Sequence, residues 1–256
     1  MIASLPMYDA ADCRAANDRF WARIREGLRS VGVAAPDALT RGMPDFMAHW
    51  MRPDLLLSQT CGFPFRAMLQ GKVTLIGTPD FGLQGCPPGY YQSVFVVRAS
   101  DARNDVAAFK DARFAYNDPM SQSGWAAPQT HAAGLGFRFA PAVQSGGHAL
   151  SARAVLDGHA DIAALDAWTW ELVQRNEAGM TGLRVLARTE PTPGLPYIAA
   201  LGVNHRAVFD AVAAAIAALE ASDRTLLGVK RLLYIPAPAY LAVPTPVPPD
   251  QNVHRN

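Results

Sequence analysis

Residues 117–124 read Asn117-Asp118-Pro119-Met120-Ser121-Gln122-Ser123-Gly124, between the apolar run 114–116 and a segment of helical character. Small hydroxyl residues between a strand end and a helix start leave backbone N–H groups unpaired, and Ser121 or Ser123 can cap them. A helix start of this kind suits an anion. The simpler alternative is an ordinary turn with an N-cap serine, punctuated by Pro119 and Gly124.

Strand-type apolar runs alternate with helical segments on both sides of this stretch. The predicted strands lie within 2–8, 55–57, 73–77, 90–98, 113–116, 141–145, 160–166, 183–189 and 197–201. The predicted helices are 10–31, 65–70, 105–109, 122–133, 149–156, 167–175 and 206–219. This alternation indicates an α/β fold with parallel sheet and crossover helices. Residues 39–50 are ambiguous, and the proline-rich tail 236–256 is predicted to be extended and to fray at its end.

Composition narrows the function. At 256 residues the chain can form one large domain or, as we prefer, two lobes. The formal charge of +1, without any Lys/Arg cluster, argues against partners such as nucleic acid or an anionic membrane surface. No apolar run is long enough to span a bilayer, and residues 1–16 lack the basic and apolar regions of a signal peptide.

The chain has three cysteines, Cys13, Cys61 and Cys86, so at least one stays unpaired within the chain. Cys61 and Cys86 lie in glycine-containing loops after strand-type runs, and both a disulfide and two free thiols remain open. A disulfide would imply an oxidising compartment. The histidines at 131, 148 and 159 lack the spacing of metal-ligand pairs, so no metal site is predicted.

Polar residues follow several predicted strands, at positions 8–9, 58–62, 121–124, 145–148 and 166. In open parallel sheets, ligands bind at the carboxyl ends of the strands. If two lobes face each other, these loops converge on one cleft, and opposed helix N-termini can hold a small anion. Taken singly, His148 is equally a residue of a helix-cap region, and Asp166 is more simply the N-cap of helix 167–175.

In this order and spacing, the motifs resemble the substrate-binding proteins of phosphate, phosphite and phosphonate ABC transporters, of the type 2 periplasmic binding protein fold. The resemblance covers nearly the whole chain and rests on residues 117–124, on Ser-Gly-Gly-His at 145–148 with 154–166, and on Pro-Gly-Leu-Pro-Tyr at 193–197. It implies two α/β lobes, each a mainly parallel sheet flanked by helices, which close on a ligand without covalent chemistry or a cofactor. The expected lobe I is 1–92 with 198–256, and lobe II is 93–197.

The resemblance also implies the site. Ser121, Ser123 and Gly124 match the phosphoryl-binding loop of the family, and the acidic group at 166 would suit a ligand that carries an amine. The expected ligand-binding residues are Tyr8, Thr60, Tyr91, Ser121, Gln122, Ser123, Gly124, His148 and Asp166. The family pattern Ser-Thr-Ser-Gly reads Ser-Gln-Ser-Gly here, so an amide at Gln122 replaces a hydroxyl donor and the choice of anion stays open.

The function implied is capture of a small anionic ligand of the phosphate, phosphite or phosphonate class, by a periplasmic monomer that serves an ABC transporter permease. Because residues 1–16 do not resemble an export signal, a cytosolic sensor or carrier with the same fold is an alternative. A second alternative is an enzyme in which Cys61, His148 and Asp166 act as nucleophile, base and orienting group. A third alternative is a binding protein for an organic carboxylate, which stacks on Tyr91, Trp168 or Trp170.

Overall fold

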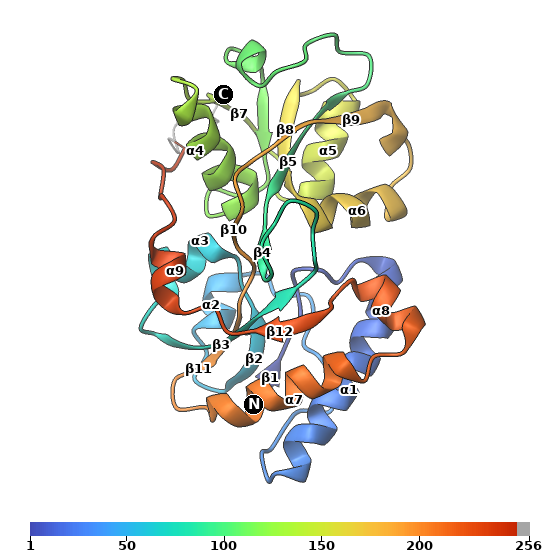
Figure 1. Ribbon diagram of the computed structural model, residues 1–256, viewed down its shortest axis with the longest axis vertical. Coiled ribbons are helices and arrows are strands. Elements are labelled where there is room, and N and C mark those ends of the chain that lie inside the picture. The colour runs from blue at the N-terminus through green and yellow to red at the C-terminus, as the bar shows by residue number, and fades with distance from the viewer. Residues whose placement is uncertain (250–256) are drawn as a thin grey trace. The chain divides into compact units, whose positions relative to one another are not determined.

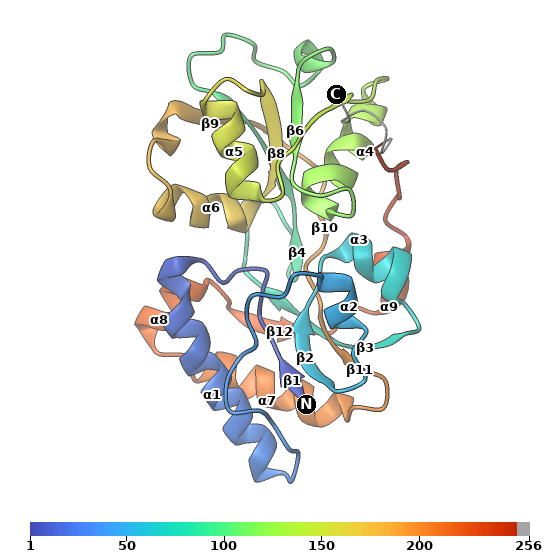
Figure 2. The same cartoon turned by 180° about the vertical axis from the view of Figure 1, so that it is seen from behind.

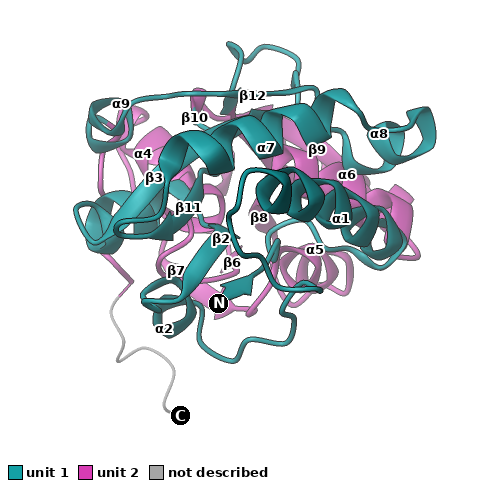
Figure 3. Ribbon diagram, turned by 90° about the horizontal axis from the view of Figure 1, so that it is seen from below, with its two compact units in different colours: residues 1–90, 193–242 teal, residues 91–192, 243–256 magenta. Residues whose placement is uncertain are grey.

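The computed structural model describes residues 1–249 and divides the chain into two compact units (Figure 3). Unit 1 comprises residues 1–90 and 193–242, and unit 2 comprises residues 91–192 and the segment that begins at Val243. The chain crosses from one unit to the other in the short strands β4 (Tyr90–Tyr91) and β10 (Thr192–Pro193), which pair with each other. The expected fraying at the C-terminus lies outside the described residues.

Unit 1 is built on a sheet with the strand order β1-β2-β11-β3-β12 (Figure 1). Its strands are β1 (Ile2–Ala3), β2 (Leu55–Gln59), β3 (Val73–Asp80), β11 (Tyr197–Ala200) and β12 (Arg231–Leu233). Its helices are η1 (Ala11–Cys13), α1 (Arg14–Ser30), α2 (Phe46–Trp50), α3 (Gly62–Pro64), η2 (Phe65–Leu69), α7 (His205–Ala217), α8 (Ala221–Leu227) and α9 (Ala237–Leu241). The apolar face predicted for α1 is buried, with Phe20, Ile24 and Leu28 at most 2% exposed.

Unit 2 is built on a second sheet with the strand order β7-β6-β8-β5-β9 (Figure 2). Its strands are β5 (Ser93–Arg98), β6 (Phe114–Tyr116), β7 (Pro141–Gln144), β8 (Ile162–Asp166) and β9 (Leu183–Arg188). Its helices are η3 (Ala107–Phe109), η4 (Gln122–Ala126), α4 (Ala127–Gly134), α5 (His148–Leu156), α6 (Ala167–Asn176) and η5 (Met180–Gly182).

The two-lobed α/β fold predicted from the sequence is confirmed. In unit 2, β7, β6, β8 and β9 run in one direction and β5 runs antiparallel to both of its neighbours. In unit 1, β1, β2 and β3 run in one direction, and β11 and β12 run antiparallel to them. The reason is the path of the chain. β5 follows the crossing into unit 2 and β11 follows the return to unit 1, so neither enters its sheet through a crossover helix.

The proline-rich tail is not simply extended. It forms the short helix α9, in which Pro238 occupies the first turn, where a missing N–H costs nothing. Tyr240 of this helix is 1% exposed, and its hydroxyl donates to the Gly194 carbonyl at 3.0 Å. Beyond α9, the Val247 carbonyl accepts from the Trp125 indole at 3.2 Å, so this part of the tail packs on unit 2 rather than with the expected lobe I.

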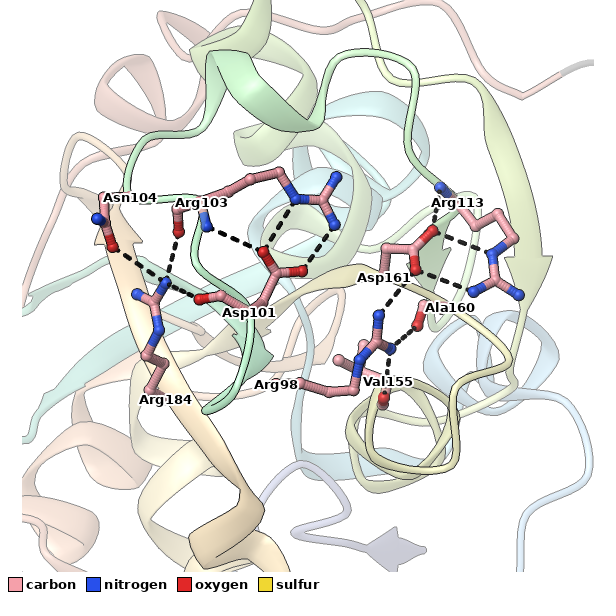
Figure 4. A network of polar contacts seen from close by, with 9 residues as sticks. All are labelled: Arg98, Asp101, Arg103, Asn104, Arg113, Val155, Ala160, Asp161 and Arg184. Carbon is pink, nitrogen blue, oxygen red and sulfur yellow. Dashed lines mark hydrogen bonds and ion pairs between the residues drawn. The ribbon is translucent and has the colours of Figure 1, made fainter.

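An arginine–aspartate network ties three neighbouring strands of unit 2 together (Figure 4). Asp161, just before β8, accepts from Arg98 at the end of β5 at 2.9 Å, and from Arg113, just before β6, at 2.9 and 3.0 Å. Arg98 also donates to the carbonyls of Val155 and Ala160. The hydrogen bonds from Arg113 and Arg98 hold the pKa of Asp161 far below its usual range. The network therefore stabilises the amino-terminal ends of β6 and β8.

Candidate functional site

Three helix starts meet at one edge of the unit 2 sheet. Strands β7, β6 and β8 are neighbours and run parallel, so their carboxyl ends lie at the same edge. Each leads into a helix: β6 into η4, β7 into α5, and β8 into α6. The first N–H groups of a helix have no partner within it, and the helix dipole favours negative charge there. Each helix start therefore contributes the positive end of its dipole to this edge of unit 2.

The loop 117–124 is organised by its own side chains. The Asp118 carboxylate accepts from the Met120 N–H at 2.7 Å, and the Asp118 carbonyl accepts from the Ser121 N–H at 3.0 Å. Ser121 is the N-cap of η4, because its hydroxyl oxygen accepts from the Gly124 N–H at 3.0 Å. Gln122 and Ser123, the first residues of η4, are each 2% exposed. The predicted helix start is thus present, with Ser121 as its cap.

His148 is the first residue of α5 and contacts this loop. Its Nε2 lies 3.0 Å from the Ser123 hydroxyl oxygen. Burial lowers the pKa of His148 to about 4, so the imidazole is neutral near pH 7. A neutral imidazole that donates from Nε2 leaves the Ser123 hydroxyl proton free for another acceptor. His148 can therefore orient Ser123 toward a bound anion.

Asp166 ends β8 and caps α6. One carboxylate oxygen, Oδ1, accepts from the N–H groups of Trp168 at 2.7 Å and Thr169 at 2.9 Å. Asp166 is only 2% exposed, so its carboxyl group is buried against these backbone donors. The capping role considered for Asp166 from the sequence is present in the structure. A buried carboxylate at this edge also favours a ligand that brings a hydrogen-bond donor of its own.

Three side-chain atoms at this edge are buried without a hydrogen-bond partner within the described residues: Ser93 Oγ, Asn117 Oδ1 and His148 Nδ1. Ser93 begins β5 and is in register with Asp166, Asn117 directly follows β6, and His148 begins α5. Buried polar groups are nearly always paired, and an unpaired one costs about 1–3 kcal/mol. Their gathering where three helices begin is typical of a site that completes its hydrogen bonds with a ligand.

The other predicted site residues lie elsewhere in the chain. Tyr8 and Thr60 belong to unit 1, and Tyr91 lies in the crossing strand β4. Tyr8 packs edge-to-face on Phe81 with ring centroids 5.0 Å apart. Thr60 is fully buried, and its N–H donates to the Pro196 carbonyl at 3.1 Å. The structure therefore brings together residues 121–124, 148 and 166 within unit 2. A role of Tyr8, Thr60 and Tyr91 in ligand binding stays a prediction.

The sequence reasoning did not place Ser93 or Asn117 in the site. Asn117 could have been identified from the sequence, because it is the first polar residue after a strand and begins the loop. Ser93 could hardly have been identified, since it is a single polar residue at the start of an apolar run. Only the strand register shows that Ser93 faces Asp166.

The cysteines, the possible metal ligands and the lengths of the helices bear on the other functions considered from the sequence. Within residues 1–249, Cys13, Cys61 and Cys86 are not joined by disulfides. Residues 1–249 contain no group of three or more His, Cys, Asp or Glu side chains arranged to hold a metal ion. In the same residues, every helix is too short or too polar to cross a membrane.

Comparisons with known proteins agree with this geometry. The sequence profile of the periplasmic substrate-binding proteins of phosphonate ABC transporters matches residues 60–232. No curated protein sequence matches the chain. Among solved structures, PhnD1 from Prochlorococcus marinus, in complex with methylphosphonate, is 19% identical, with a TM-score of 0.70 over 93% of this chain and 94% of that chain.

Two further structures share the fold at lower identity. XAC2383 from Xanthomonas citri, bound to ATP, is 13% identical, with a TM-score of 0.67 over 94% of this chain and 97% of that chain. A binding protein component of an ABC phosphonate transporter, PA3383 from Pseudomonas aeruginosa, is 13% identical, with a TM-score of 0.62 over 91% of this chain and 80% of that chain. The type 2 periplasmic binding protein fold predicted from the sequence is confirmed.

Proposed function

We propose, from the premise that this chain belongs to the family of periplasmic substrate-binding proteins of phosphonate ABC transporters, that it captures a small phosphorus oxyanion at the helix-start edge of unit 2. As a member of this family it is a solute-binding protein. The proposal concerns what it binds and how: a phosphonate, phosphite or phosphate whose oxygens accept from the start of η4, at Ser121 to Gly124. The monomer is the proposed functional unit, and the periplasm its proposed compartment.

One observation supports the proposal most strongly. Three helix starts share the edge of the unit 2 sheet at which the parallel strands β7, β6 and β8 end. A tetrahedral anion needs several short hydrogen bonds in different directions, and converging helix starts supply them from the backbone. Residues 121–124 also resemble the phosphoryl-binding loop of the family. Both lines of argument therefore select the same atoms.

Other residues take supporting roles in the proposal. The Ser123 hydroxyl donates to the anion while accepting from His148, which stays neutral near pH 7 because burial lowers its pKa to about 4. The resemblance to the family supports Tyr8, Thr60 and Tyr91 as further proposed ligand-binding residues. No covalent step and no cofactor are needed, since the protein's work is to bind, release and deliver the ligand to its transporter.

Ser121→Ala and Ser123→Ala are each expected to weaken binding of methylphosphonate by about 1–3 kcal/mol, because each removes a hydroxyl that organises or donates to the anion site. Isothermal titration calorimetry of the two variants measures this change directly. Ser121→Ala also removes a helix cap, which costs stability by itself.

Asn204→Ala is the matched control for the stability that Ser121→Ala loses with its helix cap. Asn204 caps α7 through its side-chain oxygen, which accepts from the Ala207 N–H at 3.1 Å. Its loss is expected to lower the melting temperature to a similar extent without changing the dissociation constant. If Ser121→Ala and Ser123→Ala both bind methylphosphonate as tightly as Asn204→Ala does, the assignment of the anion to this loop is wrong.

A further inference from the structure

Unit 1 has a small cavity of its own, at the edge of its sheet where β1, β2 and β3 end. Its volume is about 30 Å³, whereas about 10–15 Å³ is enough to hold one water-sized group. The cavity therefore has room for the end of a small molecule. The residues that line it all belong to unit 1: Leu5, Tyr8, Asn17, Phe20, Gln59, Phe81, Tyr197, Leu227 and Val229.

Tyr197, the first residue of β11, lines this cavity with a side chain that is only 5% exposed. Its hydroxyl has no hydrogen-bond partner within the described residues. Burial raises the pKa of Tyr197 far above its ordinary value of 10, so the hydroxyl keeps its proton at neutral pH. Buried polar groups are nearly always paired, so a phenol without a partner beside a cavity indicates that a bound group completes its hydrogen bonds.

Two buried amides, Gln59 and Asn17, line the same cavity and are 2% and 6% exposed. Gln59 is the direct partner of Tyr197 in the antiparallel pair β2–β11, so their side chains leave the same face of the sheet. The Gln59 Nε2 donates to the Leu195 carbonyl at 3.1 Å, and the Asn17 Nδ2 donates to Asp9 at 3.0 Å. The protein thus fixes both amide nitrogens, whereas neither side-chain oxygen accepts a hydrogen bond within the described residues.

The lining of the cavity matches a neutral hydroxyl group. None of the lining residues is charged, so a charged group would lose its hydration there without gaining a counter-charge. A plain alkyl group would leave the phenol and the two amide oxygens without partners. A hydroxyl can donate to an amide oxygen and accept from the Tyr197 hydroxyl at the same time. The aromatic and aliphatic side chains of the lining suit the carbon that carries such a hydroxyl.

We propose that this cavity is a subsite for a hydroxyl on the organic end of the ligand, with Tyr197 as its specificity-determining residue, and that the substrate class is a short hydroxyalkyl phosphonate. The proposal rests on the proposed function, because it concerns the other end of the ligand whose phosphoryl group binds at η4. Tyr8 supports the connection, since it lines the cavity and is also a proposed ligand-binding residue. Asp166, which belongs to unit 2, is not among the lining residues.

The experiment compares two probes by isothermal titration calorimetry: methylphosphonate, which has no hydroxyl on its carbon, and 2-hydroxyethylphosphonate, which has one. The wild type is expected to bind both and to prefer the second. Tyr197→Phe is expected to weaken binding of 2-hydroxyethylphosphonate about fivefold, as for loss of one neutral hydrogen bond, and to leave methylphosphonate within about twofold. The ligand-free variant is expected to keep or raise its melting temperature, since the hydroxyl that it loses has no partner in the fold.

Tyr240→Phe is the matched control, because the hydroxyl of this buried tyrosine has structural partners in the Gly194 carbonyl and the Thr78 hydroxyl. It is expected to lower the melting temperature while leaving the ratio of the two affinities unchanged. An unchanged ratio in Tyr197→Phe, or an equal change in Tyr240→Phe, overturns this inference alone. So does a wild type that binds methylphosphonate but does not prefer 2-hydroxyethylphosphonate. A wild type that binds neither probe overturns the proposed function and this inference with it.

Discussion

Gly124→Ala is expected to weaken binding of methylphosphonate by at least tenfold and to lower the free energy of unfolding by about 1–3 kcal/mol. A Cβ at residue 124 would overlap the side-chain oxygen of Asn117 and lie 2.9 Å from its Cγ and 3.2 Å from the Ser121 hydroxyl. The nearest atoms belong to the short side chain of Asn117, so either this side chain or the loop must shift to make room. The start of η4 would then lose the geometry on which its hydrogen bonds to an anion depend. Calorimetry and chemical denaturation measure the two effects separately.

Gly134→Ala is the control for this variant. Gly134 ends α4, only ten positions further along the chain, and a Cβ there would meet no atom within 4 Å. We expect unchanged binding and an unchanged or slightly higher stability. The double variant Asn117→Ala with Gly124→Ala should regain part of the lost stability, since the obstructing amide is gone. Wild-type affinity in Gly124→Ala would contradict the placement of the anion at this helix start.

Asp161→Asn is expected to lower the free energy of unfolding at pH 7 by about 2 kcal/mol, because it leaves the partly buried Arg98 and the exposed Arg113 without their shared carboxylate. The Asp161 side chain is 17% exposed, and the network ties β5, β6 and β8 together (Figure 4). Urea denaturation checks the value. Asp210→Asn is the control: its ion pair with Arg206 is exposed on α7, and its loss is expected to cost no more than about 0.5 kcal/mol.

The same network predicts a dependence on pH. The pKa of Asp161 is lower in the folded protein than its ordinary value of 3.8, because Arg113 and Arg98 stabilise its charged form. Hydrogen bonds from Arg103 likewise lower the pKa of Asp101 to about 2. The stability from these groups is therefore fully present above about pH 4 and is lost as pH falls toward the folded values. In Asp161→Asn the loss of stability below pH 4 should be shallower; an equally steep loss would contradict this account.

The sequence predicted the parts of the fold that depend on local patterns. The apolar periodicity of α1, the alternation of strands and helices, and the cap at the start of η4 all follow from neighbouring residues. The orientation of β5 and β11 could not be predicted from neighbouring residues. It depends on where the chain crosses between units rather than on either strand's composition. The helix α9 was missed because its prolines were read as an extended tail.

The candidate site was predictable to a similar degree. The loop 121–124 could be recognised from its motif, but the contact between Ser123 and His148 joins residues 25 positions apart and needs the parallel pairing of β6 and β7. The capping of α6 by Asp166 was anticipated from its place at a strand end. The unpaired hydroxyl of Ser93 had no counterpart in the sequence, since whether a buried group finds a partner depends on the whole tertiary structure.

The measurement that tests the central claim most directly is a thermal-shift screen of the wild-type protein against phosphate, phosphite, methylphosphonate, 2-aminoethylphosphonate and small carboxylates. A ligand bound only by the folded state raises the melting temperature, and above its dissociation constant the rise grows with the logarithm of the ligand concentration. We predict such a concentration-dependent rise with at least one phosphorus oxyanion and none with the carboxylates. A rise with a carboxylate alone, or no rise with any phosphorus oxyanion, would contradict the claim that this protein captures its ligand by a phosphoryl group.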